Sequence, residues 1–214
     1  MSWFKRQTYP EFYTNYLESF KGKSNTLETI RFVVFDTETT GLNPKSDRIL
    51  SIGTVAVTNF QIDVADSLEL YVKQEQFNAK TVEIHGLLKE GLITKTEETQ
   101  AIQQFLAHIE NAVLVAHHIA FDVAMINEAL KRMNLPKLKN KVVDTGTLYK
   151  KTKYLKDETH YSLDELCATF NITMHDRHTA SGDAYLTAVL FLKLTALLRQ
   201  KKSRLSLRDL TGWF

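Results

Sequence analysis

A run of apolar residues that ends in two acids constrains this chain more than any other feature. The stretch FVVFDTETTGLNP, residues 32–44, opens with FVVF, and such a run is typical of a central strand buried on both faces. Asp36 and Glu38 follow at once. Since side chains in a strand alternate between faces, both carboxylates should project from one face.

Two carboxylates side by side repel each other, and two explanations compete. Asp36 and Glu38 could be solvated residues in a turn, which is the commoner case for Asp-x-Glu alone. Because the pair ends a buried strand and precedes the turn TTGLNP, a divalent cation held by both is the better explanation. Hard oxygen ligands favour Mg²⁺ or Mn²⁺.

The segments around this strand predict an α/β fold. Two further stretches, ILSIGTVAVTNF and DSLELYVK, resemble strands of an antiparallel meander, whereas AVLVA and KVVDT are short buried strands. Helical periods alternate with these later strands. The sequence therefore predicts a mixed sheet, antiparallel in its first part and parallel in its second, with helices on its faces. The strands are expected at residues 31–35, 49–60, 66–73, 112–116 and 141–145.

Capping signals mark the expected helices. Thr94 with Glu97 and Ser162 with Glu165 both have the spacing of a capping box. An aromatic-rich helix with Pro10 as its first residue is expected near the N-terminus, packed against the domain or, as the alternative, docked on a partner. The remaining helices are expected at residues 121–133 and at about 183–199.

Three more residues could join the acidic pair. Asp122 follows the strand AVLVA and Asp183 opens the last helix, so both lie at helix starts, where the helix dipole favours an ionised carboxylate. Asp at a helix start is usually only a cap. Together with His178, however, four acids at strand or helix ends would make a two-metal hydrolytic site.

Five motifs, FDTETTGL, IHGL (84–87), AHHIAFD (116–122), VDTGTLY (143–149) and HTASGDA (178–184), follow one another along the chain. Their order resembles that of the DnaQ-like 3′–5′ exonucleases, and within them the DEDDh group that includes the epsilon proofreading subunit of bacterial replicative polymerase. The resemblance implies a ribonuclease H-like fold, and metal ligation by Asp36, Glu38, Asp122 and Asp183. It also implies that His178 is the general base.

The same resemblance assigns a substrate site. Backbone N–H groups near Thr39 and Thr40 are expected to meet the terminal 3′-hydroxyl, with Leu42 and Phe121 holding the base. Two departures stand out: His118 lies where the family commonly has asparagine, and Thr179 and Ala180 lie where arginine and alanine are frequent. Gly182 is expected to let the loop after His178 bend. The substrate-binding residues implied are Thr39, Thr40, Leu42, His85, His117 and Phe121.

The composition restricts the class of protein. The chain has 214 residues, enough for one domain with a real core, and its single cysteine, Cys167, is expected in the core of a protein from a reducing compartment. No apolar run was expected to reach membrane-spanning length, so the prediction is a cytoplasmic protein without a membrane partner. Three parts are expected, a helical extension (1–28), an exonuclease domain (29–200) and a tail (201–214).

Several alternatives stay open at this stage. The predicted activity is removal of 5′-mononucleotides from single-stranded or frayed DNA 3′ ends, with a replicative polymerase or sliding clamp as the suggested partner. An RNA-trimming exonuclease or a non-catalytic module that binds nucleic-acid ends are the rivals. The lysines of residues 131–156 could follow a nucleic-acid backbone or form a solvated face. The tail could dock on a partner or fold back, and Asp144 in VVDTGT is expected to act in a turn rather than bind metal.

Overall fold

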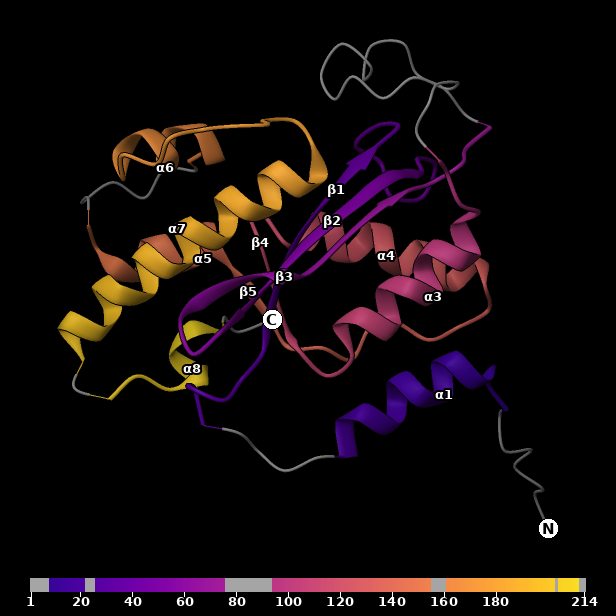
Figure 1. Ribbon diagram of the computed structural model, residues 1–214, viewed down its shortest axis with the longest axis horizontal. Coiled ribbons are helices and arrows are strands. Elements are labelled where there is room, and N and C mark those ends of the chain that lie inside the picture. Colours follow the sequence, from indigo (N-terminus) through magenta and orange to yellow (C-terminus); the bar gives the residue numbers. More distant parts are fainter. Residues whose placement is uncertain (1–7, 22–25, 76–93, 155–160, 203, 212–214) are drawn as a thin grey trace.

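Five strands form one mixed sheet in the order β3-β2-β1-β4-β5. The structure, a computed structural model, describes residues 8–21, 26–75, 94–154, 161–202 and 204–211 (Figure 1). The first three strands are antiparallel neighbours, and β4 and β5 continue the sheet in parallel from β1. The predicted meander and parallel half are therefore confirmed. The strands are β1 (Phe32–Thr39), β2 (Ile49–Thr58), β3 (Gln61–Tyr71), β4 (Val113–Ala116) and β5 (Val142–Asp144).

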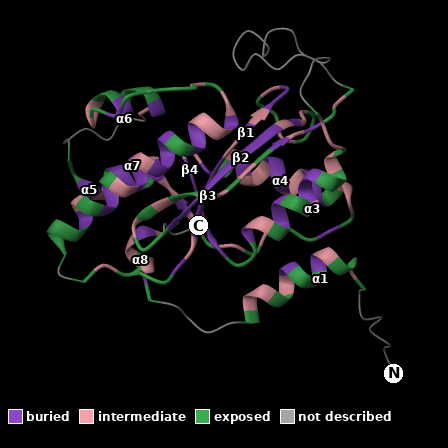
Figure 2. Cartoon of the chain, viewed as in Figure 1, coloured by how far each residue is buried: buried purple, intermediate pink, exposed green. Residues whose placement is uncertain are grey.

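Helices cover both faces of the sheet. One group, α1, α3 and α4, packs on the face that carries Val33 and Phe35 of β1, and the other, α5 to α8, packs on the face of Phe32 and Val34 (Figure 1). Buried residues lie along the strands and on the sheet-facing sides of helices (Figure 2). The helices are α1 (Glu11–Glu18), α3 (Glu98–Ile109), α4 (Ala120–Arg132), α5 (Thr145–Thr152), α6 (Leu163–Thr169), α7 (Ala180–Lys201) and α8 (Leu207–Leu210), with a short 3-10 turn, η1 (Ser19–Lys21).

Both ends of the described chain pack on the domain. Tyr13 and Tyr16 of α1 are buried, and their hydroxyls bond to Pro136 O (3.2 Å) and Asn140 Oδ1 (2.7 Å). At the other end Leu210 of α8 is buried in the second core, and Lys151 Nζ donates to the carbonyl of Asp209 at 3.0 Å. In these described segments, α1 packs against the domain, which was the first alternative for that helix, and the tail folds back, which was the second alternative for the tail.

Local details differ from the predictions at two helix starts. Thr94 does not begin α3, because Thr96 first pairs with β3 through its N–H to Tyr71 O at 2.8 Å, and Glu97 is the N-cap without a side-chain capping bond. Pro10 is the N-cap of α1, with an extended ψ of 152°, rather than its first helical residue. The capping box of Ser162 and Glu165 is formed, as predicted.

Helix α7 is the long apolar helix of the second core. An 18-residue window within this 22-residue helix has a mean hydropathy of 1.3, which by length and composition alone would suffice to cross a membrane, and 56% of that window is buried inside the protein. The prediction that no apolar segment reaches this length was therefore wrong. The helix packs along β1 and β2 through residues such as Phe191 and Leu194, as a core helix does.

Candidate active site

Three carboxylates meet at the carboxyl end of β1. One oxygen from each of Asp36, Glu38 and Asp183 lies within 4.8 Å of the others. Asp36 and Glu38 follow Phe32 and Val34 on the face covered by α7, as strand alternation predicted, and Asp183 lies in the first turn of that helix. The fold thus brings an acid from residue 183 to two acids of the first strand.

A glycine on the neighbouring strand allows this approach. Gly53 of β2 pairs with Asp36 across the sheet, and a Cβ at Gly53 would lie 2.2 Å from the Ala180 carbonyl carbon. Ser181 Oγ then donates to Glu69 Oε1 on β3 at 2.6 Å. The N-terminus of α7 therefore rests directly on the sheet because residue 53 has no side chain. Sequence reasoning missed Gly53, whose only signal was a glycine inside an apolar strand.

The fourth acid comes from the opposite face. Asp122 in the first turn of α4 is 3% exposed, and its Oδ1 accepts hydrogen bonds from Thr37 N (3.0 Å) and Thr37 Oγ1 (2.7 Å). Burial raises the pKa of Asp122 to about 7, against the effect of these hydrogen bonds. Among the described residues, Asp122 does not join the close group of three, but its charge acts on both β1 acids.

The cluster is short of positive charge. Burial, followed by the charges of Asp122, Asp183 and Glu38, raises the pKa of Asp36 well above its usual range. Burial and the charges of Asp183 and Asp122 raise the pKa of Glu38 to about 7. A divalent cation would oppose these shifts, because its charge favours the ionised carboxylates and offsets their mutual repulsion, and an all-carboxylate donor set suits Mg²⁺ or Mn²⁺. The residues present therefore fit the metals predicted from the sequence.

A nearby arginine supplies part of the missing charge. Arg177 donates from Nε to Asp164 Oδ1 at 2.6 Å, and its Nη1 forms an ion pair with Asp183 Oδ1. Its charge also lowers the pKa of Asp36 and of Glu38, against the larger effects that raise them. The sequence analysis noted that the arginine frequent in the family after His178 is replaced by Thr179, but it did not consider Arg177, directly before His178.

His178 lies outside the carboxylate group. The side chain is exposed, and the backbone has a φ of 62°, a left-handed conformation that is uncommon for residues other than glycine. Gly182 does not bend the loop as expected, because it is already in α7. It is needed there since a Cβ would lie 2.0 Å from the carbonyl oxygen of Asp176.

The loop after β1 is held by its threonines. Thr39 Oγ1 donates to Gly41 O (2.8 Å), and Thr40 N donates to Arg48 O (2.9 Å). The N–H of Thr40 is therefore engaged within the protein, and the expectation that N–H groups near Thr39 and Thr40 meet a substrate hydroxyl stays a prediction. Leu42 in the same loop is 86% exposed. An apolar side chain in that position can contact a ligand without any rearrangement of the core.

The other side chains predicted to bind substrate differ in whether they are already engaged in contacts within the protein. Both ring nitrogens of His117 are engaged, at 2.9 Å from Thr145 Oγ1 and 3.0 Å from Tyr161 O. Burial lowers the pKa of His117 to about 4. Phe121 is half-buried and packs against the first core. His85, with its motif IHGL, lies outside the described residues.

Two residues that were expected not to bind metal or substrate have structural roles. Asp144 caps α5 by accepting from Thr147 N at 2.7 Å, and its other oxygen accepts from Ile119 N at 3.0 Å. It thus joins the turn before α4 to the end of β5, as the prediction of a turn residue implied. Cys167 is fully buried in the second core, as predicted.

Comparisons with known proteins agree with this geometry. The exonuclease family model of RNase T type matches residues 33–191, which include all four acids and His178. The chain belongs to the DnaQ-like exonuclease family. A DNA polymerase III subunit epsilon of Treponema pallidum (strain Nichols) is 31% identical to this chain over 169 residues, 79% of this chain and 78% of that protein. The resemblance noted from the motifs is therefore confirmed.

Larger relatives contain a similar domain. A PolC-type DNA polymerase III of Halalkalibacterium halodurans is 33% identical over 168 residues, 76% of this chain but only 11% of the polymerase. A second PolC-type polymerase, from Thermotoga petrophila, is 29% identical over 177 residues and is matched over 13% of its length. The chain thus spans a small part of these polymerases.

Solved structures confirm the fold. Exonuclease X in complex with 5′ overhanging duplex DNA superposes with a TM-score of 0.63 at 20% identity, over 85% of this chain and 98% of that one. E. coli Exonuclease I in complex with a dT13 oligonucleotide gives a TM-score of 0.69 at 14% identity, over 81% and 42%. At these identities the likeness establishes the ribonuclease H-like exonuclease fold and no more.

Proposed function

We propose that this protein is a metal-dependent 3′–5′ exonuclease that releases 5′-mononucleotides from the 3′ ends of DNA. The observation that carries the proposal is the group of Asp36, Glu38 and Asp183, with ligand oxygens within 4.8 Å of one another at the end of a buried strand. A fold tolerates such repulsion where a bound cation offsets it.

The four acids have distinct parts in this proposal. Asp36, Glu38 and Asp183 would hold divalent cations, and Asp122, fixed by Thr37, would complete the site from the α4 side. When bound, Mg²⁺ or Mn²⁺ supplies charge neutralisation at the phosphate and makes a water molecule more acidic. The protein's own contribution is to keep the carboxylates in place before substrate arrives, since α7 rests on Gly53.

Proton transfer is assigned to His178. A neutral imidazole can accept the proton of the attacking water near neutrality, and the exposed side chain has room to turn toward the acids. Arg177, adjacent in sequence, is paired with Asp183 and Asp164. Once cations occupy the acids, its guanidinium is no longer needed as their counter-charge and is suited to bind a phosphate oxygen.

The site is proposed to hold the terminal nucleotide between the loop after β1 and the start of α4. Leu42 would contact one face of the base and Phe121 the other, with the N–H groups near Thr39 meeting the 3′-hydroxyl. A site that binds a hydroxyl in this way rejects a substrate lacking it, because buried polar groups stay unpaired. A 3′-phosphate should therefore block the enzyme, also through repulsion from Glu38.

DNA as substrate and a role in proofreading are further parts of the proposal. They are supported by the names of the similar proteins, which are DNA polymerase III subunits and exonucleases solved with DNA. A replicative polymerase or its sliding clamp would be the partner, and the cytoplasm the location. Single-stranded or frayed ends should be preferred, because a paired terminal base must first unstack at a cost of a few kcal/mol.

The deciding experiment follows both ends of one substrate. A single-stranded DNA oligonucleotide labelled at either its 5′ or its 3′ end, and an RNA of the same sequence, are incubated with enzyme and Mn²⁺. The proposal expects a ladder that shortens from the 3′ end, 5′-mononucleotide products, faster loss of DNA than RNA, and no reaction with a 3′-phosphate. Shortening from the 5′ end, or cutting of a circular strand, would contradict the exonuclease direction.

The same assay separates the rivals. Faster degradation of RNA would identify an RNA-trimming enzyme with the same metal chemistry. Binding of the oligonucleotide without any cleavage in Mg²⁺ or Mn²⁺ would identify a module that only binds ends.

A further inference from the structure

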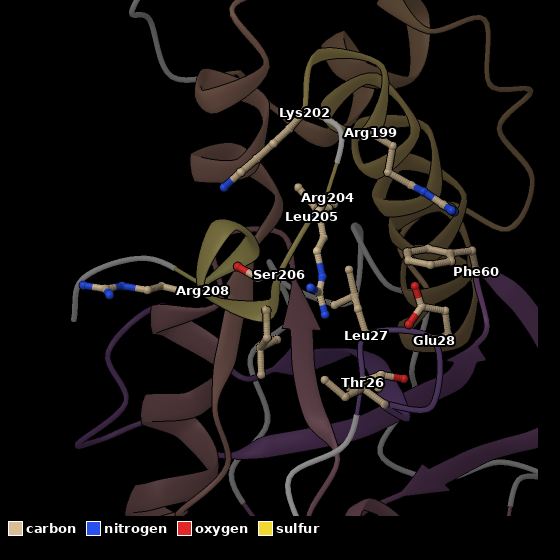
Figure 3. Close-up of a pocket in the computed structure, with 12 residues that line it drawn as sticks. Thr26, Leu27, Glu28, Phe60, Arg199, Lys202, Arg204, Leu205, Ser206 and Arg208 are labelled. Carbon is tan, nitrogen blue, oxygen red and sulfur yellow. The ribbon is translucent and has the colours of Figure 1, made fainter.

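A groove lies at the end of the molecule remote from the carboxylates. Asp183 is in the first turn of α7 and Arg199 in its last, so the two are about 24 Å apart along the helix axis at 1.5 Å per residue. Around Arg199 the segment before β1, the β2–β3 turn and the tail enclose a cavity of about 670 Å³ (Figure 3). A second, smaller cavity lies beside it and shares Ile30 and Leu207 with it, and we call the two cavities together the basal groove.

The basal groove has an apolar floor. The smaller cavity has a volume of about 340 Å³. Leu27 and Ile30 are only 8% and 9% exposed, and half-buried Leu205 and Leu207 line the larger cavity with them. Both volumes lie in or near the range of sites that take small ligands or peptide side chains. The floor can therefore accept apolar groups.

The rim of the basal groove is basic. Glu28 is the one acid among the described residues that line the larger cavity. Hydrogen bonds to its own backbone and to Thr26, followed by the charges of Arg199 and Arg204, lower its pKa. Asp209 next to the cavity forms an ion pair with Lys202. Even after these pairs, the positive charges exceed the negative ones. The basic lining residues are Arg199, Lys202, Arg204 and Arg208, with Lys139 and Lys141 in the smaller cavity.

The aromatic rings of the groove are already covered. Arg199 lies over the ring of Phe60 at 4.4 Å from its centroid, and Lys139 lies over that of Phe20 at 5.3 Å. Single-stranded nucleic acid binds such surfaces by stacking its bases on free aromatic faces. A peptide needs no such face, because its carboxylates pair with the rim and its apolar side chains reach the floor. The arrangement favours a peptide over a nucleic acid.

We propose that the basal groove binds an extended acidic segment of a partner protein, with alternate apolar side chains on the floor and acidic ones against Arg199 and Arg204. In an extended peptide, residues two apart point to the same side, so one strand can satisfy both surfaces. The groove uses none of the residues of the candidate active site. The proposal is thus independent of the exonuclease activity.

The test uses a defined probe. Fluorescence anisotropy measures binding of a fluorescein-labelled peptide, Asp-Leu-Glu-Leu-Asp-Glu, to the full chain at low salt. The test variant is Arg204→Glu, and the control is Lys193→Glu, an equal charge change at an exposed position of α7 outside the groove. We expect saturable binding, weakened about tenfold or more by Arg204→Glu and less than about twofold by Lys193→Glu. Cleavage of short oligonucleotides should be unchanged in both variants.

Other outcomes would overturn the proposal. Equal loss in both variants would show only general charge attraction, and absence of saturable binding up to about 1 mM peptide would exclude a useful site. Displacement of the peptide by a dT6 oligonucleotide, with dT6 binding weakened by Arg204→Glu, would assign the groove to nucleic acid instead. A Lys-Leu-Lys-Leu-Lys-Lys peptide that binds as well as the acidic one would remove the role of charge.

Discussion

The two ends of α7 carry opposite charge in opposite settings. At its N-terminus, Asp183 meets Asp36 and Glu38 in a partly or wholly buried group, and the pKa values of Asp36 and Glu38 are raised. At its C-terminus, Arg199 belongs to the basic rim of the basal groove, whose lining arginines are exposed to solvent. The same helix thus separates a compressed acidic cluster from a solvated basic one.

The two clusters differ in how much the repulsion between their like charges destabilises the folded state. Like charges in water are screened and repel weakly, so exposed arginines can gather with little loss of stability. Like charges removed from water repel strongly and lose hydration, which makes the acidic cluster unfavourable unless a cation joins it. The acidic end therefore indicates a function by its charge alone, whereas the basic end does so only through its concave shape and apolar floor.

Removal of one acid should have the largest effect. Asp36→Ala is expected to reduce the exonuclease rate more than about 100-fold, since the loss of a metal ligand should cost several kcal/mol of transition-state stabilisation. Single-turnover cleavage of a 5′-labelled oligonucleotide in Mn²⁺ measures it. Asp63→Ala, at an exposed position of β3, is the matched control and should keep its rate. A rate above about a hundredth of wild type in folded Asp36→Ala would contradict the metal assignment.

Loss of the proposed base should be nearly as damaging. His178→Gln is expected to slow cleavage by about 100-fold, within the usual range for general bases, while Mn²⁺ binding stays unchanged because His178 lies outside the ligand group. In wild type the rate should fall at acid pH, where an imidazolium cannot accept a proton. At Mn²⁺ concentrations that saturate the acids at every pH tested, an acid limb that persists unaltered in the residual activity of His178→Gln would place the base elsewhere.

The third effect concerns Arg177, whose guanidinium is the positive charge paired with Asp183. Arg177→Ala removes the partner of Asp183, so Mn²⁺ no longer competes with a guanidinium, and we expect Mn²⁺ binding to tighten about tenfold. Isothermal titration without nucleic acid measures this independently of catalysis. The cleavage rate should nevertheless fall, if Arg177 also contacts phosphate.

A control and a contrary result sharpen this test. Lys193→Ala removes a positive charge from an exposed position further along α7 and should leave Mn²⁺ affinity within about twofold. Weaker Mn²⁺ binding in Arg177→Ala would mean that the guanidinium organises the acids rather than competing for them.

The contrast between the two ends also explains what the sequence could predict. The sheet and the acidic group followed from local signals, because strand alternation puts Asp36 and Glu38 on one face and helix starts mark Asp122 and Asp183. The pairing of Arg177 with Asp183 was not predicted, because it depends on how the loop before α7 folds. The basal groove was not predicted either, since the segments that meet there lie far apart in the chain.

The capping errors have a related cause. Thr94 and Glu97 have the right spacing for a capping box, but a backbone pair between Thr96 and Tyr71 takes precedence over it. Local propensity is a weak prior that tertiary contacts override. In contrast, Ser162 and Glu165 have no competing strand pairing among the described residues, and their capping box forms as predicted.

The smallest expected effect is on stability, and it compares the two ends directly. Asp36→Asn removes one of the repelling charges, so the metal-free variant should melt a few degrees higher than wild type at pH 8. Arg204→Gln removes a charge from the basic rim, where water already screens it, and should stay within about 0.5 kcal/mol of wild type. Thermal melts followed by circular dichroism in EDTA measure both.

The sign of the pH dependence provides the stricter version of this test. Because the folded pKa of Asp36 lies above its unfolded value, the folded state holds a proton that the unfolded state has lost, and stability decreases as pH rises through the folded pKa. His117, whose folded pKa is lowered to about 4, acts in the opposite direction between about pH 4 and 6.5, but it is present in both proteins and cancels in their difference. The gain in melting temperature from Asp36→Asn should therefore be larger at pH 8 than at pH 5. At pH 8, Mn²⁺ should raise the melting temperature of wild type more than that of the variant, because the variant lacks one of the carboxylates that bind the cation. An Asp36→Asn protein that melts below wild type at pH 8 in EDTA would show that the acidic end is not under strain, and the contrast between the two ends of α7 would fail.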